Sequence, residues 1–590
     1  MTDTTDTTRV ATARPWLDAS LPVDERVQLL LDEMTIEEKA GLFFHTMIAI
    51  GDLDETNPVF GTPSAREFVE GKRMTHFNLL GAAPTGREIA AWQNELQRLA
   101  ASTRLGIPVT LSTDPRHSFS ENPGASILAG PFSQWPETLG LAATRDAELV
   151  QRFGDIARQE YTAVGLRVAL HPQVDLATEP RWARQTATFG EDAELSGILG
   201  AAYIRGFQGE AFGPGSVSTM TKHFPGGGPQ KDGEDPHFPY GREQVYPGGE
   251  FELHLAPFED ALAAGTRQMM PYYGMPVGTE YEEVGFGFNR SVITGLLRER
   301  FGFDGLVCTD WGLINDAEIF GQPFPARAWG VEHLTPKERM RKVLDAGVDQ
   351  FGGEDCPELL VELVAEGAIS QERVDVSARR ILREKFELGL FENPFVDEDA
   401  ADEIVGRAEF RAAGEAAQRA SITVLVNDGA LPFPTGRRLY VEGVDREVAA
   451  AYGEVVDAPE DADLAVVRLQ APFDVRETMF ENFFHAGSLE FPEEILDRVR
   501  AIAAAVPTVV DVLADRPPIL GPIVDVAAAV TLNWGASGAA LLDVLSGAVP
   551  ARGRLPFDLP SSMAAVEASR PDVPFDTSEP LFRFGHGLVM

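Results

Sequence analysis

The tetrapeptide Thr309-Asp310-Trp311-Gly312 is the first candidate for chemistry in this 590-residue sequence. Asp310 follows the apolar run GLVC at 305–308, so we expect its carboxylate at the end of a strand. Such a carboxylate can attack the anomeric carbon of a sugar or stabilise an oxocarbenium ion. The indole of Trp311 offers a flat apolar face to a pyranose ring. A structural aspartate beside a core tryptophan is the alternative that this short motif leaves open.

A glycine-rich segment, TKHFPGGGPQKDGEDPHF at 221–238, carries the second group of candidates. We expect Lys222 and His223 to donate hydrogen bonds to sugar hydroxyls. The segment lacks the GxxxxGK[ST] pattern of a phosphate-binding loop, and its acidic residues would repel phosphate. The spacing of its potential metal ligands is irregular, so we expect no bound metal.

Two arginines lie in a third segment, PRWARQTATFGED at 180–192. The planar guanidinium groups of Arg181 and Arg184 suit bidentate hydrogen bonds to neighbouring hydroxyls, or an ion pair that orients a carboxylate. For a lone arginine, an exposed ion pair would be the simpler interpretation.

Strands and helices alternate through the first two thirds of the chain, which predicts a parallel sheet with crossover helices. Helical patterns lie at 87–103 and 146–165. The strand-like runs at 106–114, 167–175 and 305–311 each end on or near an aspartate: Asp114, Asp175 and Asp310. The length suits a TIM-like (β/α)8 barrel, in which chemistry takes place at the carboxyl ends of the strands. The three aspartates are therefore expected on one face.

The chain divides into four predicted parts, because a single core rarely exceeds roughly 250–300 residues. Residues 1–20 are a polar, flexible N-terminus, and the (β/α)-barrel spans 21–391. A linker follows at 392–417 and opens with the acidic, proline-containing stretch ENPFVDEDA. Short β-branched runs at 421–428, 463–470, 507–515 and 527–535 predict a smaller doubly wound α/β domain over 418–590.

The amino-acid composition disfavours some classes of binding partner. The formal net charge of −41 argues against nucleic acid and anionic membrane surfaces, whereas a neutral sugar is not repelled. The N-terminus has no apolar h-region and no run of about 18 apolar residues occurs, so we expect a cytoplasmic protein without a membrane span. The two cysteines form no zinc or redox motif, and Cys308 is expected to be buried.

Seven segments, taken together and in order, resemble glycoside hydrolase family 3, the β-glucosidase group. They are RLGIPVTLSTDPRHS (104–118), PRWARQTATFGED (180–192), TKHFPGGG (221–228), QMMPYY (268–273), FDGLVCTDWG (303–312), GASGAALLDVLSGAVPARGRLPFDLP (535–560) and LFRFGHGL (581–588). The resemblance implies a barrel followed by an α/β sandwich domain, with the active site between them. Where relatives have glycine after the histidine of the first segment, this chain has Ser118.

The resemblance also implies residue roles. Asp310 matches the catalytic nucleophile, and Asp114 matches the aspartate that grips the distal sugar hydroxyls. The remaining matches are sugar-binding: Arg184, Lys222 and His223, Tyr272 as the tyrosine near the nucleophile, and Trp311 in the aromatic wall.

The acid/base catalyst is less well defined. In this family it often comes from a variable loop of the second domain, here RLQAPFDVRETMFENFFHAGSLEF at 468–491, where Glu481 and Glu477 are the candidates. Glu481 lies among phenylalanines that would raise its pKa. A branch of the family acting on N-acetylglucosamine uses a His–Asp dyad in the barrel instead. Asp235 and His237 in the sequence Asp-Pro-His make that dyad the third option.

The sequence therefore predicts a retaining, exo-acting β-glucosidase that cleaves small-molecule or oligosaccharide β-glycosides without a cofactor or metal. Within the family, β-xylosidase and β-N-acetylglucosaminidase are the alternatives, and a sugar-binding homologue without catalysis is a third. A nucleotide-dependent enzyme is disfavoured, because VLVNDGALPF at 424–433 lacks a phosphate-binding fingerprint. Whether the protein forms a homodimer is open.

Overall fold

A computed structural model describes residues 14–56, 61–115, 117–120, 127–319 and 321–590. In this part of the chain, parallel strands close into an eight-stranded barrel in the order β1-β12-β9-β7-β5-β4-β3-β2, which confirms the predicted (β/α)8 class. The barrel strands are β1 (Phe44–Ala49), β2 (His76–Leu80), β3 (Thr110–Thr113), β4 (Leu166–Ala169), β5 (Ser218–Phe224), β7 (Gln268–Pro271), β9 (Leu306–Trp311) and β12 (Gln350–Gly352).

The helices of the barrel begin where the sequence supplies N-terminal caps. The side chain of Thr85 caps α3, that of Asp146 caps α5, and that of Asp192 caps α6. The α-helices in this part are α1 (Val23–Glu33), α2 (Ile36–Gly41), α3 (Gly86–Ser102), α4 (Thr138–Thr144), α5 (Ala147–Ala163), α6 (Ala193–Gln208), α7 (Phe251–Ala263), α8 (Pro336–Ala346), α9 (Pro357–Ala365) and α10 (Gln371–Glu387).

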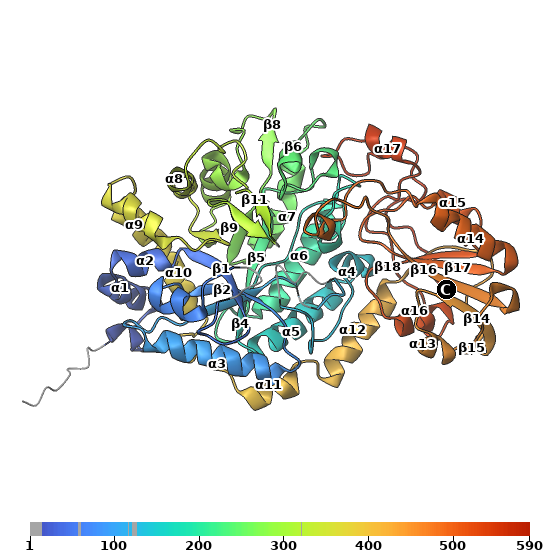
Figure 1. Cartoon of the computed structure of the whole chain (residues 1–590), viewed down its shortest axis with the longest axis horizontal. Coiled ribbons are helices and arrows are strands. Elements are labelled where there is room, and N and C mark those ends of the chain that lie inside the picture. The colour runs from blue at the N-terminus through green and yellow to red at the C-terminus, as the bar shows by residue number, and fades with distance from the viewer. Residues whose placement is uncertain (1–13, 57–60, 116, 121–126, 320) are drawn as a thin grey trace, which may run out of the picture.

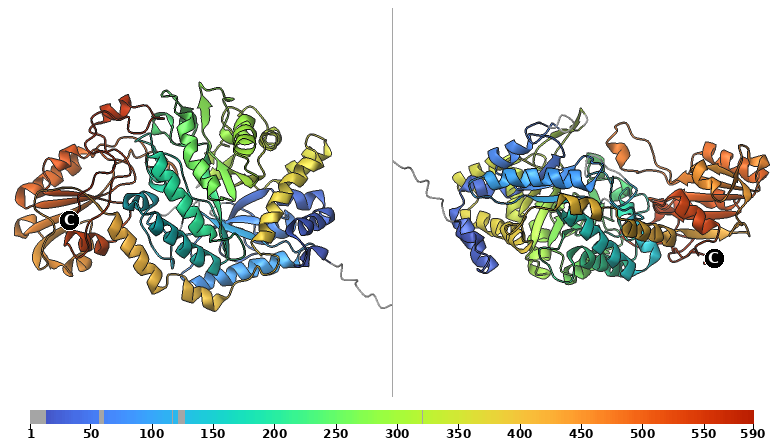
Figure 2. Two further views of the ribbon diagram at one scale, coloured as in Figure 1. Left: turned by 180° about the vertical axis from the view of Figure 1, so that it is seen from behind. Right: turned by 90° about the horizontal axis from the view of Figure 1, so that it is seen from below.

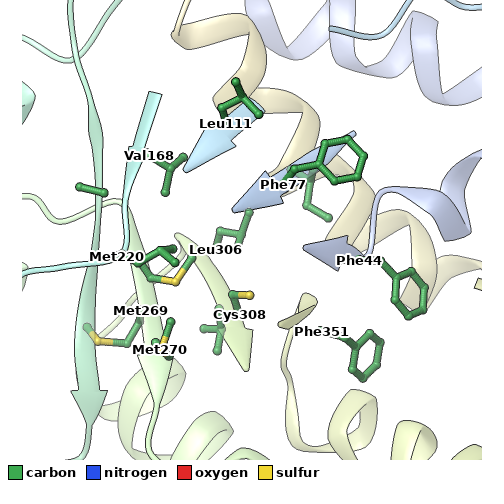
Figure 3. Close-up of a cluster of buried hydrophobic side chains, with 14 of the residues drawn as sticks. Phe44, Phe77, Leu111, Val168, Met220, Met269, Met270, Leu306, Cys308 and Phe351 are labelled. Carbon is green, nitrogen blue, oxygen red and sulfur yellow. The ribbon is translucent and has the colours of Figure 1, made fainter. Parts of the chain in front are cut away.

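Apolar side chains from successive barrel strands form one buried core. Figure 3 shows members of it side by side, and those on β1, β2, β3 and β12 (Phe44, Phe77, Leu111 and Phe351) have no exposed surface. Cys308 on β9 belongs to the same cluster and is fully buried, as predicted. Strands covered on both faces explain why these segments are almost continuously apolar.

A six-stranded sheet forms the second domain, in the order β13-β18-β17-β16-β14-β15. Its strands are parallel except for β13, which pairs antiparallel with β18. The strands are β13 (Thr423–Asn427), β14 (Arg437–Glu442), β15 (Gly453–Val455), β16 (Leu464–Gln470), β17 (Thr508–Leu513) and β18 (Ala529–Asn533). The helices are α13 (Arg446–Ala450), α14 (Glu493–Ala505), α15 (Gly521–Val524), α16 (Gly538–Leu545) and α17 (Met563–Ala568).

The two domains lie side by side and share packing (Figures 1 and 2). Leu139 and Ala143 of the barrel helix α4 belong to the core of the second domain. The backbone N–H of Glu137 donates to the carbonyl of Trp534 at 2.7 Å. Residues of both domains line one cavity, among them Asp114 just beyond β3 and Phe484 of the second domain.

Two connecting segments contain local structure. The expected linker at 392–417 contains α11 (Glu398–Ile404) and most of α12 (Ala408–Ser421), and Asp397 caps the first of these helices. In the expected flexible N-terminus, Trp16 is buried, and its carbonyl accepts a hydrogen bond from Arg26 at 2.7 Å. Residues 1–13 lie outside the described residues, and the four domain boundaries stay predictions.

Three small elements lie in the connections between barrel strands β5 and β12. A short parallel pair joins β6 (Glu243–Val245) to β8 (Met275–Val277), and an antiparallel pair joins β10 (Ala317–Ile319) to β11 (Gln322–Phe324). A π-helical segment, Ser291–Arg300, precedes β9. Within the described ranges, no helix is long and apolar enough to cross a bilayer.

Candidate active site

The predicted site residues lie at the carboxyl ends of four barrel strands: β5, β7 and β9 are neighbours, and β4 separates β5 from β3. Such strands present their ends on one face of the barrel, so residues far apart in sequence meet there. Asp114 follows β3, Lys222 and His223 lie late in β5, the tyrosine pair Tyr272-Tyr273 follows β7, and Asp310 and Trp311 end β9.

One carboxylate oxygen of Asp310 lies close to the side chains of His223 and Arg184. Its Oδ1 accepts the backbone N–H of Trp311 at 2.8 Å. Its Oδ2 lies 3.8 Å from Nε2 of His223 and 4.0 Å from Nη1 of Arg184. Among the described residues, none of these three buried atoms has a hydrogen-bond partner. Buried polar groups are nearly always paired, so this convergence is typical of a site that receives a polar ligand.

His223 is held as a neutral ring. Burial, together with the positive charges of Arg184 and Lys222, places its pKa well below the ordinary value. Oδ2 of Asp175 lies 2.8 Å from Nδ1 of the ring, and Oδ1 of Asp175 accepts the backbone N–H groups of His223 and Gly227. With the proton on Nδ1, Nε2 offers a lone pair that can accept a hydrogen bond; the predicted role of His223 towards sugar hydroxyls stays a prediction.

Arg184 stays charged in this setting. Burial on its own would lower its pKa, but Tyr272 and the carboxylates of Asp235, Asp310 and Asp175 raise it above the ordinary value. Arg181, in contrast, pairs with Glu179 at 2.9 Å and does not contact Asp310 in the described structure. The structure thus brings one of the two predicted arginines to the site.

Asp114 and Lys222 form an ion pair of 2.6 Å on the wall of a cavity of about 470 Å³. Arg184 lines the same cavity and lies 4.0 Å from Oδ2 of Asp310, while Asp310 and His223 are not among the lining residues. The opposite wall comes from the second domain and includes Phe484 and His485. The cavity therefore lies between the domains, where the resemblance placed the active site.

The tyrosine beside the nucleophile candidate is Tyr273, not the predicted Tyr272. Its hydroxyl donates to the carbonyl of Trp311 at 2.7 Å, and burial followed by the charge of Asp310 raises its pKa well above the ordinary value. The hydroxyl of Tyr272 instead accepts a hydrogen bond from Trp182 at 3.2 Å. Consecutive residues beyond a strand end point in different directions, so the motif alone did not separate the two.

Trp311 and Arg327 complete the end of β9. The indole of Trp311 is half-buried and packs on His45, with ring centroids 5.4 Å apart. The guanidinium of buried Arg327 donates to the carbonyl of Trp311 at 2.6 Å and 3.2 Å. The backbone after Asp310 is thereby fixed from two sides, by Arg327 and Tyr273. No pattern in the sequence pointed to Arg327.

The structure does not bring Glu477 or Glu481 to Asp310. Glu481 accepts hydrogen bonds from Tyr240 at 2.9 Å and from the hydroxyl of Thr478 at 2.8 Å. Burial on its own would raise the pKa of Glu481, but these hydrogen bonds lower it, which does not suit a proton donor. Glu477 is exposed, and no described contact links it to the site.

Asp235 and His237 do lie at the site. Nδ1 of His237 is 2.6 Å from Oδ1 of Asp235, which also accepts the backbone N–H of residue 237 at 2.8 Å. The His237 ring packs on Tyr273, with centroids 4.6 Å apart, and Tyr273 neighbours Asp310. Burial on its own would raise the pKa of Asp235, but the charges of His237 and Arg184 lower it, so the carboxylate is ionised.

Comparison with known proteins agrees with this geometry. The profile of the "Glycosyl hydrolase family 3 N terminal domain" matches residues 79–384, and that of the "Glycosyl hydrolase family 3 C-terminal domain" matches 335–590. "Probable beta-glucosidase C" of Aspergillus oryzae is 53% identical over 97% of this chain and 90% of its own length. "Periplasmic beta-glucosidase/beta-xylosidase" of Dickeya chrysanthemi is 41% identical, over 99% of this chain and 92% of its own length.

Solved structures share the fold. A β-glucosidase from Listeria innocua in complex with isofagomine superposes with a TM-score of 0.77 at 22% identity, covering 96% of this chain and 83% of its own. A β-glucosidase from Erythrobacter marinus gives a TM-score of 0.80, also at 22% identity, over 98% of this chain and 84% of its own. The profiles, the close relatives and the strand-end site agree: the chain belongs to glycoside hydrolase family 3.

Proposed function

We propose that this protein is an exo-acting, retaining β-glucosidase. The observation that carries the proposal is the convergence of three buried, unpaired polar atoms in the described structure: Oδ2 of Asp310, Nε2 of His223 and Nη1 of Arg184. A carboxylate oxygen beside a fixed donor and a fixed acceptor suits attack on the C1 of a bound pyranose. Relatives named β-glucosidase, at 52–53% identity, support glucose as the sugar that is removed.

In the first step, Oδ2 of Asp310 attacks C1 and the bond from C1 to the leaving oxygen breaks. That oxygen must take up a proton as it leaves, or the departing group carries a full negative charge. In the second step, water attacks C1, loses a proton to the group that donated one before, and releases Asp310 as a carboxylate. Two displacements at one carbon retain its configuration.

We assign the proton transfers to His237, held by Asp235, rather than to Glu481 or Glu477. His237 contacts Tyr273 beside Asp310, whereas both oxygens of Glu481 accept hydrogen bonds from Tyr240 and Thr478. An imidazole hydrogen-bonded to an ionised carboxylate can donate a proton and later take one up. The Asp235–His237 pair was the third option at the level of sequence.

The hydroxyls of the sugar would be held by the remaining groups. Lys222 and Arg184 can donate only, Asp114 can accept only, and neutral His223 accepts through Nε2. A sugar hydroxyl is both donor and acceptor, so this mixture matches a neutral sugar better than a phosphate or a carboxylate.

A panel of p-nitrophenyl β-glycosides tests the proposal. We expect the β-D-glucoside to give the highest kcat/KM, and Asp310→Asn to lower kcat by about a thousandfold or more with unchanged circular dichroism. A preference for the N-acetyl-β-D-glucosaminide would refute the sugar assignment. Binding of glucose without any hydrolysis by the folded wild-type protein would favour a sugar-binding homologue.

β-Xylosidase activity is the second candidate function, because the Dickeya chrysanthemi relative carries both activities in its name. Glucose and xylose differ by one hydroxymethyl group, which amounts to roughly 1–3 kcal/mol of discrimination. The β-D-xyloside in the same panel measures this difference directly.

The cellular location and the oligomeric state of the protein can each be decided by one experiment. We propose a cytoplasmic location, although the relative from Dickeya chrysanthemi is named periplasmic; fractionation of the native host decides between them. Whether the protein forms a homodimer is decided by sedimentation of the full chain.

A further inference from the structure

Arg516 of the second domain is a fully buried arginine with unusual partners. Its Nη1 donates to the carbonyls of Arg181 and Gly487 at 3.0 and 3.1 Å. Its Nη2 donates to the carbonyls of Pro472 and Ser488 at 2.6 and 3.4 Å. No described carboxylate forms an ion pair with it. Burying a guanidinium without a counter-ion is destabilising unless it is hydrogen-bonded. The hydrogen bonds to these four carbonyls offset that cost and join the segments that carry them.

The four carbonyls belong to two segments that meet at the active site. Pro472 and Gly487-Ser488 are the two ends of a second-domain loop, residues 472–488, which runs between β16 and α14. Arg181 lies in the barrel segment that carries Arg184, three residues further on. Arg516 therefore closes the base of the loop and fastens it to the barrel in one place.

The same loop covers the segment that carries the proposed proton donor. Phe484 packs on the ring of His237, with centroids 4.5 Å apart. Arg476 forms a 2.8 Å ion pair with Glu234, next to the dyad in sequence. Nδ1 of His485 lies 2.5 Å from Oδ2 of Asp515, the residue before Arg516. The loop thus contacts His237 through Phe484, close in sequence to Gly487, while Arg516 holds both ends of its base.

We infer that Arg516 is a positioning residue for proton transfer. By holding the base of loop 472–488 against the barrel, it keeps Phe484 on one face of His237 and so fixes this ring between Phe484 and Tyr273. The inference rests on the proposed function, and specifically on His237 as the proton donor.

The test uses two β-glucosides that differ in their need for a proton. A 2,4-dinitrophenolate leaves readily without protonation, whereas the methoxide of methyl β-D-glucoside does not. For each protein, the ratio of kcat/KM for the methyl glucoside to kcat/KM for the dinitrophenyl glucoside reports proton donation. A role in overall folding alone lowers both values together and leaves the ratio unchanged.

We expect Arg516→Met to lower this ratio by at least about tenfold, and Arg516→Lys to lower it less, since an ammonium group can still reach some of the carbonyls. His237→Gln should lower it further. Arg468→Met is the control: Arg468 is another second-domain arginine, which donates to the carbonyl of Ala536 at 2.6 Å and pairs with buried Asp511 at 3.2 Å, and no described contact links its side chain to the loop. That variant should reduce Tm without changing the ratio.

Phe484→Ala leaves the carbonyl partners of Arg516 in place and removes the ring contact with His237, along with contacts to Phe238 and Phe480, so it must also lower the ratio. It serves if Arg516→Met does not fold. An unchanged ratio in folded Arg516→Met, or in Phe484→Ala, overturns the inference and leaves the proposed β-glucosidase standing. An unchanged ratio in His237→Gln removes both the proton-donor assignment and this role of Arg516. If the wild-type protein cleaves neither glucoside, the proposed function itself fails.

Discussion

Nε2 of His223 lies 3.8 Å from Oδ2 of Asp310, while the other nitrogen of the ring is fixed by Asp175 at 2.8 Å. The imidazole is thus oriented by a buried carboxylate for which the described structure shows no contact with Asp310. Asp175 also accepts two backbone N–H groups, so its own position is fixed. We therefore expect sugar binding at Asp310 to depend also on Asp175, which contacts His223 on the side of the ring away from Asp310.

Asp175→Asn should lower kcat/KM by about tenfold to a hundredfold without unfolding the protein. An asparagine amide cannot accept from the ring and from both backbone N–H groups, and leaving a buried donor unpaired costs about 1–3 kcal/mol. Steady-state kinetics with p-nitrophenyl β-D-glucoside measure the effect. Asp192→Asn is the control, since Asp192 caps α6 and asparagine caps equally well; equal losses in both variants would contradict the role of Asp175.

The wild-type pH profile should carry the signature of the same carboxylate. Burial raises the pKa of Asp175 to about 6. Below that pH the group takes up a proton, stops accepting from Nδ1 of His223, and kcat/KM falls. The acidic limb of the kcat/KM profile should therefore lie near pH 6 and be altered in Asp175→Asn. An identical acidic limb in the variant would show that Asp175 does not govern it.

The adjacent tyrosines provide a matched pair. Tyr273→Phe removes the hydrogen bond to the carbonyl of Trp311 and the hydroxyl beside Asp310, so kcat/KM should fall by about tenfold. Tyr272→Phe removes only the acceptor for Trp182, so stability should fall more than activity. Kinetics and thermal unfolding of both variants decide the assignment, and a larger loss of kcat/KM in Tyr272→Phe would reverse it.

Much of the fold and part of the site could be predicted from the sequence. Apolar runs that end in aspartate marked the barrel strands, because parallel strands buried on both faces must be apolar and must change character at their carboxyl ends. That pattern predicted Asp114, Asp175 and Asp310 on one face: Asp114 directly follows β3 and Asp310 lies at the end of β9, whereas Asp175 lies further beyond the end of β4.

The remaining features depend on contacts that no local pattern encodes. Tyr272 and Tyr273 are neighbours in sequence, and only the turn after β7 decides which one meets Asp310. The phenylalanines around Glu481 suggested a raised pKa, yet Tyr240, from the barrel 241 positions earlier, donates to its carboxylate and the pKa is lowered. Arg516 acts on backbone carbonyls, which carry no sequence signal at all.

Glu191 should make the packing of the two domains depend on pH. This buried carboxylate of the barrel accepts the backbone N–H groups of Asp558 and Phe575 in the second domain, at 2.5 and 2.9 Å. Burial raises the pKa of Glu191 from 4.5 to about 8. The folded protein therefore binds this proton more tightly than the unfolded chain does, and the stability it confers is complete below pH 4.5 and lost as pH rises through about 8.

Urea unfolding between pH 5 and 8 measures this contribution. The free energy of unfolding should fall with rising pH more steeply in the wild-type protein than in Glu191→Gln, by an amount on the order of a few kcal/mol across the window. Glu409→Gln, which changes a glutamate side chain that is 83% exposed, should keep the wild-type slope. Parallel curves for the wild-type protein and Glu191→Gln would disprove the prediction.

In the proposed mechanism, Asp310 forms a covalent bond to the C1 of the sugar. The most direct measurement is trapping with 2,4-dinitrophenyl 2-deoxy-2-fluoro-β-D-glucoside, whose fluorine slows both steps while the good leaving group keeps the first one accessible. Mass spectrometry of the digested protein should find one fluoroglucosyl group, attached to Asp310, and none in Asp310→Asn. A label on any other residue, or full turnover by Asp310→Asn, would contradict the account.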